Sequence, residues 1–322
     1  MSRKRSNWFG VTATWLLLFA AHAEAAVADL EPRAVAVLLE ASRSDDALLR
    51  MHAVEGAAAM PERALPMVQL ALEDANPAVR FAAWVTTGKL RLVSLAGRAE
   101  SAAANVAEPD YVQAAAIFAA HRCGRQADLG RLASMLYSDD PRLRSNAALL
   151  FGLMDDTPAA VVVLTDAAET PLLRSEPVER ELFRLQLAEA LVNLGQTESL
   201  KALRGAAYSN ENEVRVLAVM MLGRADDRGM RGNLTNFLAR DPVELRLAAA
   251  EALARMGFLD GLPVMLAASE SPSATLRVQA AFALGQASAD AEAAARLAAL
   301  LEDPLPRVRV AAAASALAAI HD

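Results

Sequence analysis

The sequence predicts an all-α fold, a solenoid of about nine stacked two-helix repeats that follows an N-terminal leader. The first observation is composition: 74 of the 322 residues are alanine, and only 5% are aromatic. Alanine has the highest helix propensity and is poor in strands. The second is an arginine-centred phrase that recurs at nearly constant spacing, and the third is a helix-start signal before most of its copies. A bulky aromatic core, a β-sandwich and a disordered acidic chain are therefore not expected.

Residues 1–25 are expected to be a signal peptide. A basic cluster, residues 3–5, precedes an uncharged and largely apolar run over 8–21, and small residues follow at A-x-A spacing. That order is typical of a secretory leader, and the run is short for a membrane span. The alternative is an uncleaved segment that anchors the chain in the inner membrane. Because no second apolar stretch of spanning length follows, we expect residues 26–322 to be periplasmic or secreted in a bacterium, with no stable membrane span.

The phrase that repeats after the leader is an apolar residue followed by arginine, small residues and an Ala-Leu or similar pair. Successive anchors are 30 to 33 residues apart, apart from one gap of 40, if Gln113 is counted in the same position. A fixed period of this length predicts a repeat architecture. The anchor arginines are Arg50, Arg80, Arg144, Arg184, Arg215, Arg246, Arg277 and Arg309.

Each repeat is expected to be a helical hairpin whose second helix carries the anchor. Aspartate or serine followed by proline, as at Asp303-Pro304, signals a helix start because the side chain caps free N–H groups and proline fits the first turn. We call each position of the second helix a slot and number it from the anchor arginine, which is slot 0, with positive numbers toward the C-terminus. Slots −1, +3 and +7 are mostly apolar or small, and these slots share one helical face. One hairpin cannot bury that face alone, so the hairpins are expected to stack into a right-handed superhelix.

This pattern resembles the HEAT repeat family, in particular the short HEAT-like repeats of phycobilin lyase subunits. The resemblance rests on the Asp/Pro turn, the Val/Leu-Arg pair and the following Ala-Ala-x-Ala-Leu, and it extends over residues 29–322. It implies an α-solenoid but little about activity, because such repeats serve unrelated roles. It also implies that the anchor arginines bond acidic or backbone groups of neighbouring repeats, which favours a structural role over an anion-binding ladder.

Catalytic and cofactor chemistry is not expected. The chain has one cysteine, Cys123, and four histidines, and it contains no metal, nucleotide or nucleophile motif. His52 and Glu55 share a helical face, but two ligands do not make a metal site. The resemblance allows two enzyme-related families. Deoxyhypusine hydroxylases need His-Glu dipeptides, which are absent here, and phycobilin lyase subunits work in the cytoplasm, unlike an exported chain.

The second helices are expected to present an inner wall that binds a protein partner. Slots +1, +5 and +8 point away from the core face. They predict a groove for an amphipathic helix or an extended peptide, unless neighbouring helices bury them instead. Glutamates at 55, 189 and 251 make this wall acidic at intervals, which suits a basic or amphipathic partner. The candidate partner-binding residues are Phe81, Val85, Phe118, Leu149, Met220 and Phe282.

Two further features complete the expectation. The gap of 40 places nine extra residues around 169–177, as a recognition loop, a hinge or a tolerated surface loop.

The formal net charge is −7 and no Lys/Arg-rich block follows the leader, so nucleic acid is not an expected partner. We expect an exported, non-catalytic scaffold or adaptor without a cofactor. The alternative is an accessory subunit of a lyase-like or chaperone system that holds a substrate protein or a cofactor.

Overall fold

The computed structural model describes residues 30–155, 157–170 and 175–321. Within these residues the regular elements are all helices, so the predicted all-α fold is confirmed. The expected leader lies outside the described residues. In the described part of the chain, no helix is long and apolar enough to cross a membrane.

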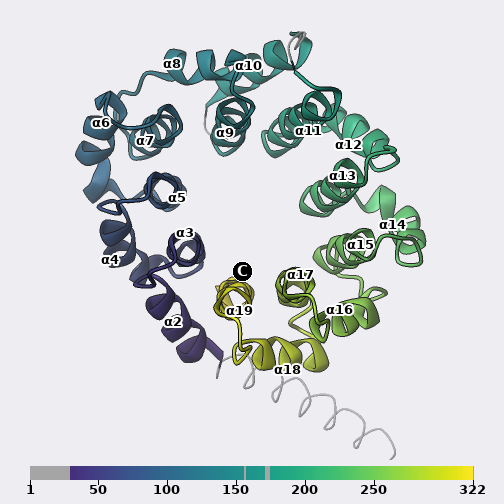
Figure 1. Cartoon of the computed structure of the whole chain (residues 1–322). Helices are drawn as coiled ribbons and strands as arrows, with labels where there is room; N and C mark the ends of the chain where they lie inside the picture. The colour runs from purple at the N-terminus through teal and green to yellow at the C-terminus, as the bar shows by residue number, and fades with distance from the viewer. Residues whose placement is uncertain (1–29, 156, 171–174, 322) are drawn as a thin grey trace, which may run out of the picture.

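The helices alternate between an outer and an inner layer (Figure 1). The outer helices are α2 (Leu30–Ala41), α4 (Pro61–Ala71), α6 (Ala96–Ala104), α8 (Leu129–Ser134), α10 (Pro158–Glu169), α12 (Leu200–Ala206), α14 (Arg231–Phe237), α16 (Leu262–Ser269) and α18 (Ala291–Leu300). The inner helices are α3 (Ala47–Gly56), α5 (Pro77–Lys89), α7 (Asp110–Arg122), α9 (Pro141–Gly152), α11 (Pro177–Asn193), α13 (Asn212–Arg224), α15 (Val243–Arg255), α17 (Ala274–Gln286) and α19 (Pro306–His321). Short 3-10 turns lie at Ala57–Ala59, Val93–Leu95, Met135–Tyr137, Thr197–Ser199 and Arg228–Met230.

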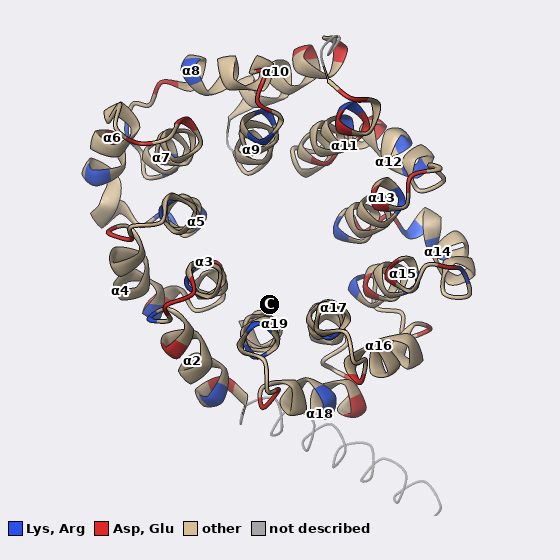
Figure 2. Ribbon diagram, in the orientation of Figure 1, with Lys and Arg blue, Asp and Glu red and all other residues tan. Residues whose placement is uncertain are grey.

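The predicted start signals shape the turns before the inner helices. The side chain of Asp46 accepts a hydrogen bond from the backbone N–H of Leu48 at 2.8 Å, and Asn76 and Asp140 cap α5 and α9 in the same way. Such caps satisfy N–H groups that the helix itself cannot pair. Many of the acidic residues of the ring lie on these turns (Figure 2).

Close approach between inner helices depends on small residues. A Cβ added to Gly223 of α13 would lie 2.6 Å from the Cα of Ala252 in α15, and one added to Gly152 of α9 would lie 2.8 Å from the Cα of Ala190 in α11. Gly223 lies in the last turn of α13, where the absence of a side chain lets α15 come this close.

Over the described residues, nine helix pairs form a closed ring rather than an open superhelix. The last inner helix, α19, packs against both α2 and α3 of the first repeat (Figure 1). One hydrophobic cluster spans this seam and includes Leu38 and Ala53 from the first repeat and Ala312 and Leu317 from the last. The apolar faces of the two terminal repeats therefore cover each other.

Charged side chains flank the seam on its outer side. Arg33 of α2 donates to Glu302 at 2.7 Å and to the Ala298 carbonyl at 3.4 Å, and Arg309 of α19 lies 3.9 Å from Glu40 of α2. Exposed pairs of this kind contribute little, typically under about 1 kcal/mol each. Apolar burial is therefore the main stabilisation of the closure.

The extra residues predicted around 169–177 divide between a helix and a loop. α11 is 17 residues long, whereas α5, α13 and α15 have 13. Four of the nine extra residues therefore lengthen α11 by about one turn at its N-terminal end. Residues 171–174 of the loop lie outside the described residues.

Candidate functional site

The anchor arginines lie along one rim of the ring, where the inner helices begin. In five of them Nη1 donates to the backbone carbonyl six residues earlier, as Arg50 does to Ser44 at 2.8 Å. Three then form a forked pair with a carboxylate of the next repeat. These pairs are Arg50–Asp74, Arg80–Glu108 and Arg277–Asp303. Their guanidinium donors are used within the fold, which leaves them poorly suited to bind an external anion.

Arg184 does not occupy the place that the sequence spacing gave it. The fourth residue of α11 is Arg180, and its Nη1 donates at 2.7 Å to the carbonyl of Ser175, five residues earlier. Arg50 makes a bond of the same spacing to Asp45 beside its six-residue bond. Arg184 lies one turn further along α11 and is exposed. The extra N-terminal turn of α11 moved the role by four residues.

Arg144, Arg215 and Arg246 make weaker or different links. Arg144 donates to Ser175 of the next repeat at 2.8 Å, where an acid stands in other repeats. Arg215 bonds Asn212 of its own helix, and Arg246 lies 3.9 Å from Asp241. The links between repeats therefore differ in strength around the ring.

Two of the predicted partner-binding residues are inaccessible. Phe118 is 0% exposed, and Val85 is also buried. The ring of Phe118 lies directly over Gly88 of α5, where an added Cβ would be 2.3 Å from it. Packing of α7 on α5 thus removes both residues from the proposed groove.

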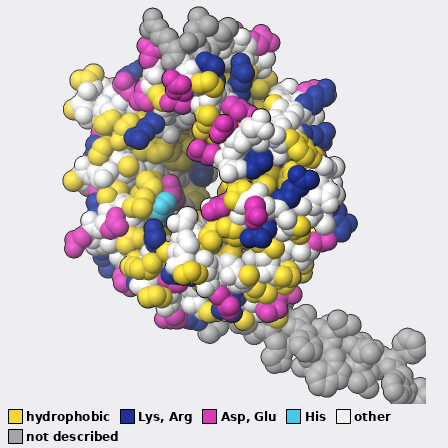
Figure 3. All heavy atoms as spheres, turned by 45° about the vertical axis from the view of Figure 1, so that its right-hand side comes forward, with side chains coloured by type: hydrophobic (Ala, Val, Ile, Leu, Met, Phe, Trp, Pro, Cys, Tyr) yellow, Lys and Arg dark blue, Asp and Glu magenta, His cyan; other side chains and the backbone are white. Residues whose placement is uncertain are grey.

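The other four predicted residues remain at least partly accessible. Leu149 of α9 is 46% exposed and Phe282 of α17 is 43% exposed, whereas Phe81 and Met220 are half-buried. Leu149 and Phe282 hold slot +5 of their repeats, so they face the same side of the inner layer. Figure 3 shows a hollow in the middle of the ring with hydrophobic side chains on its surface.

The inner wall is not acidic as the sequence suggested. Each of its three glutamates has a cationic or ionisable partner on the wall. His52 Nδ1 lies 2.8 Å from Glu55, Arg224 lies 2.6 Å from Glu189, and Arg255 lies 3.2 Å from Glu251. Because the carboxylates are paired, a basic partner gains little from them.

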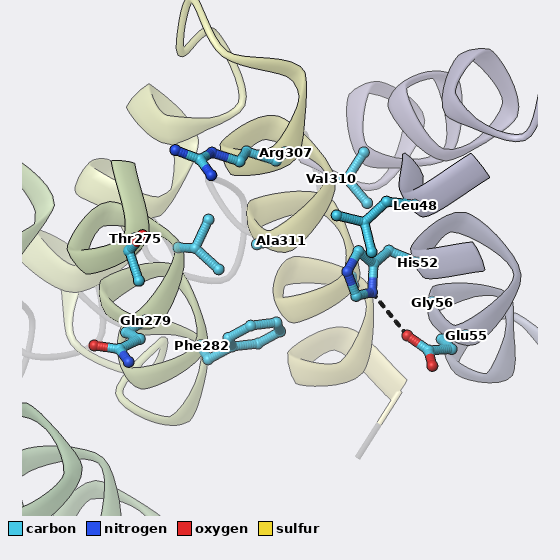
Figure 4. A pocket seen from close by; sticks show the side chains of 12 residues that line it. Leu48, His52, Glu55, Gly56, Thr275, Gln279, Phe282, Arg307, Val310 and Ala311 are labelled. Atoms are coloured by element: carbon cyan, nitrogen blue, oxygen red, sulfur yellow. Dashed lines mark hydrogen bonds and ion pairs between the residues drawn. The ribbon is translucent and has the colours of Figure 1, made fainter. Parts of the chain in front are cut away.

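A pocket of about 470 Å³ opens on this wall at the seam (Figure 4). Its lining comes from three inner helices: α3 and α19, which meet at the closure, and α17. Most of the lining is apolar, with His52, Glu55 and Arg307 as the ionisable groups. The lining residues are Leu48, His52, Glu55, Gly56, Thr275, Val278, Gln279, Phe282, Arg307, Val310, Ala311 and Ala314.

Helical register orients the pocket. Leu48, Thr275 and Arg307 all hold slot −2 and lie near the rim, while Phe282 and Glu55 hold slot +5. Seven residues of helix separate the two levels, which corresponds to about 10 Å along the wall. Figure 4 shows Arg307 reaching from α19 across one end of the pocket toward α17, with Phe282 at the other end.

His52 and Glu55 form the polar side of the pocket. The hydrogen bond to Glu55 raises the pKa of His52 against the opposing effect of burial. The described residues contain no group of three or more His, Cys, Asp or Glu side chains arranged to hold a metal ion.

Most of this pocket lies outside the wall predicted from the sequence. The predicted wall used slots +1, +5 and +8, whereas the lining also uses slots −2 and +2. Slot −2 could have been included from the sequence, because Leu48 and Arg307 both hold it and both line the pocket. That the first and last repeats share one pocket carried no local signal, since it depends on ring closure.

The comparisons with known proteins identify the repeat. Residues 230–318 match the model of HEAT repeats, which confirms the predicted repeat type for this part of the chain. No curated protein matches the sequence significantly.

Two solved structures are similar in fold. The complex of CpcE and CpcF of phycocyanin lyase from Nostoc is 17% identical, with a TM-score of 0.43, over 70% of this chain and 87% of that one. Human deoxyhypusine hydroxylase is 18% identical, with a TM-score of 0.38, over 85% of this chain and 98% of that one. Nothing about the activity of this chain follows from similarities at this level.

Proposed function

Because residues 230–318 are HEAT repeats and the same helix pair recurs around the ring, we propose that this chain is a non-catalytic protein-interaction scaffold. Its partner is an amphipathic helix or an extended apolar segment held against the inner wall. We further propose that residues 1–25 direct the chain to the periplasm and are removed.

The exposed apolar side chains of the inner wall carry this proposal. Leu48 is 50% exposed, and Leu149 and Phe282 are exposed to a similar degree, on three different inner helices. Leaving large apolar side chains in water forgoes about 25 cal/mol for each Å² that burial would remove. A partner that covers them recovers this free energy, whereas the paired wall glutamates leave little net charge to attract it.

Substitution at the wall tests the proposal. We expect Leu149→Asp and Phe282→Asp to abolish partner capture without unfolding the ring, because both side chains are already in contact with solvent. Val162→Asp on the outer helix α10 is the control, since Val162 is 69% exposed. Phe118→Asp is unsuitable because it would bury a charge.

The measurement is a crosslinking pull-down from the envelope fraction, compared between variants by quantitative mass spectrometry. A polypeptide enriched by the wild type and by Val162→Asp, but by neither wall variant, supports the proposal. Equal enrichment by all folded variants contradicts it. Recovery of the chain with its leader intact and only in the cytoplasm contradicts the proposed export.

A further inference from the structure

We propose that the seam pocket binds a small amphipathic monocarboxylate, with the carboxylate on the Arg307 guanidinium and the apolar body along the wall toward Phe282. This inference goes beyond the scaffold function, because it assigns the pocket a soluble ligand rather than a polypeptide.

Pocket size and lining favour a small apolar ligand. A volume of about 470 Å³ falls within the range of about 300–1,000 Å³ that is typical of small-molecule sites. Such sites are largely apolar with a few placed polar groups. Here the apolar body of the ligand would contact Leu48 of α3 and Val310 of α19. It would also contact Val278 and Phe282 of α17.

The positive charge of Arg307 favours a ligand with a negative group. No hydrogen bond or ion pair joins the Arg307 side chain to another of the described residues, unlike Arg277 and Arg309 on the same rim. A guanidinium binds a carboxylate through two parallel hydrogen bonds, which makes arginine a specific partner for this group. Arg307 is also the second residue of the 16-residue helix α19, whose N-terminal end favours an anion.

The position of the charges sets the orientation. Arg307 holds slot −2 at the rim, and the carboxylate of Glu55 holds slot +5, about 10 Å deeper along the wall. A carboxylate at the rim therefore avoids Glu55, which is already paired with His52. One negative group at the rim and an apolar body that runs inward are complementary to this arrangement. A ligand with a second anionic group at its inner end is not.

The chain offers a matched control for Arg307. Arg142 is the second residue of α9, follows a proline as Arg307 does, and is exposed at the same slot on the same rim. It lies in another repeat and does not line the pocket. Substituting either arginine removes the same charge from the ring, but only one of them faces the pocket.

The test is calorimetric titration of the purified chain with sodium octanoate and, as a neutral probe of similar size, 1-octanol. We expect the wild type to bind octanoate at least about tenfold more tightly than octanol, since a hydrogen bond to a charged group contributes that much or more. Arg307→Gln should remove this preference and leave octanol binding unchanged. Arg142→Gln should bind both probes as the wild type does, and Phe282→Asp should weaken both.

The outcomes separate the ligand from the partner polypeptide. Leu149→Asp should keep octanoate binding, because Leu149 does not line the pocket, although it is expected to lose partner capture. The inference is overturned if neither probe binds, if octanoate and octanol bind equally, or if Arg307→Gln keeps the preference. It is also overturned if an acetylated tripeptide ending in leucine with a free carboxylate binds while octanoate does not, since the site would then recognise a chain terminus.

Discussion

Phe118 and Phe282 hold the same slot on different inner helices, yet one is buried and the other faces the hollow. Phe118 packs against the preceding inner helix, where Gly88 at slot +8 has no side chain and leaves room for the phenyl ring. Phe282 instead lines the seam pocket together with residues of α3 and α19. The same slot thus holds a buried aromatic ring in one repeat and an accessible one in another.

The arginine pairs of the rim make stability depend on pH. The hydrogen bond from Arg50 lowers the pKa of Asp74. A carboxyl whose pKa is lower in the folded state than in the unfolded state stabilises the fold above its unfolded pKa of about 3.9, and this stabilisation is lost as pH falls through the folded value. The pair is mostly buried, so the contribution is larger than that of a surface pair.

We expect Asp74→Asn to lower the free energy of unfolding by about 1–3 kcal/mol at pH 7 and by less than that at pH 3. Urea denaturation followed by circular dichroism at the two pH values measures this. Asp241→Asn is the control, because Asp241 is 91% exposed and 3.9 Å from Arg246, and it should change stability by less than about 0.5 kcal/mol. An equal loss for Asp74→Asn at both pH values would show that the carboxylate charge is not responsible.

At the scale of the element, an inner helix begins where an arginine ties its first turn to the preceding turn. The anchor reaches a carbonyl that precedes the helix, so this bond fixes the angle at which the chain enters it. In α11 the repeat motif and the arginine-to-carbonyl hydrogen bond point to different residues. The motif keeps a fixed distance from the C-terminal end of the helix, whereas the hydrogen bond forms at its N-terminal end. Arg184 occupies the anchor position of the motif, whereas Arg180 donates the hydrogen bond to the Ser175 carbonyl.

The two arginines of α11 provide a direct comparison. We expect Arg180→Ala to destabilise the ring by about 1 kcal/mol, the usual contribution of one hydrogen bond. Arg184→Ala should change stability by less than about 0.5 kcal/mol, since this side chain is exposed. Thermal unfolding of both variants under the same conditions decides between them, and a larger loss for Arg184→Ala would restore the assignment made from spacing.

At the scale of the whole molecule, closure covers both terminal repeats. In an open solenoid each terminal repeat needs a polar outer face. Here the apolar face of α19 packs on α2 and α3, and the seam forms part of one hydrophobic cluster. Closure also creates the seam pocket, which uses residues from both ends of the chain.

Energy transfer between dyes on either side of the seam tests closure. We expect high transfer between cysteines introduced at Arg43 and Leu305 in a Cys123→Ala background, because both side chains are exposed near the seam. Transfer should persist in 1 M salt, since salt screens the flanking ion pairs and not the apolar contact.

A second pair of labels controls for the shape of the ring. Cysteines at Arg43 and Glu176, which lies on the turn before α11 on another part of the ring, should show low transfer (Figure 1). If the seam pair transfers no better than this pair, the chain is an open superhelix in solution and the shared pocket does not form.

The sequence by itself determined the helices, their pairing and their number. The caps, prolines and recurring Ala-Leu pairs act within one repeat, and each copy restates the same local preference. It also singled out Leu149 and Phe282, because slot +5 lies opposite the apolar face of the second helix in the sequence pattern.

Only the tertiary structure decided which wall residues are accessible and that the wall closes. Accessibility depends on how closely the next helix approaches, as Gly88 and Phe118 show. Closure depends on the sum of small rotations over nine repeats, so no single repeat encodes it. For the same reason the juxtaposition of Arg307 with Leu48, from opposite ends of the chain, could not be read from any local pattern.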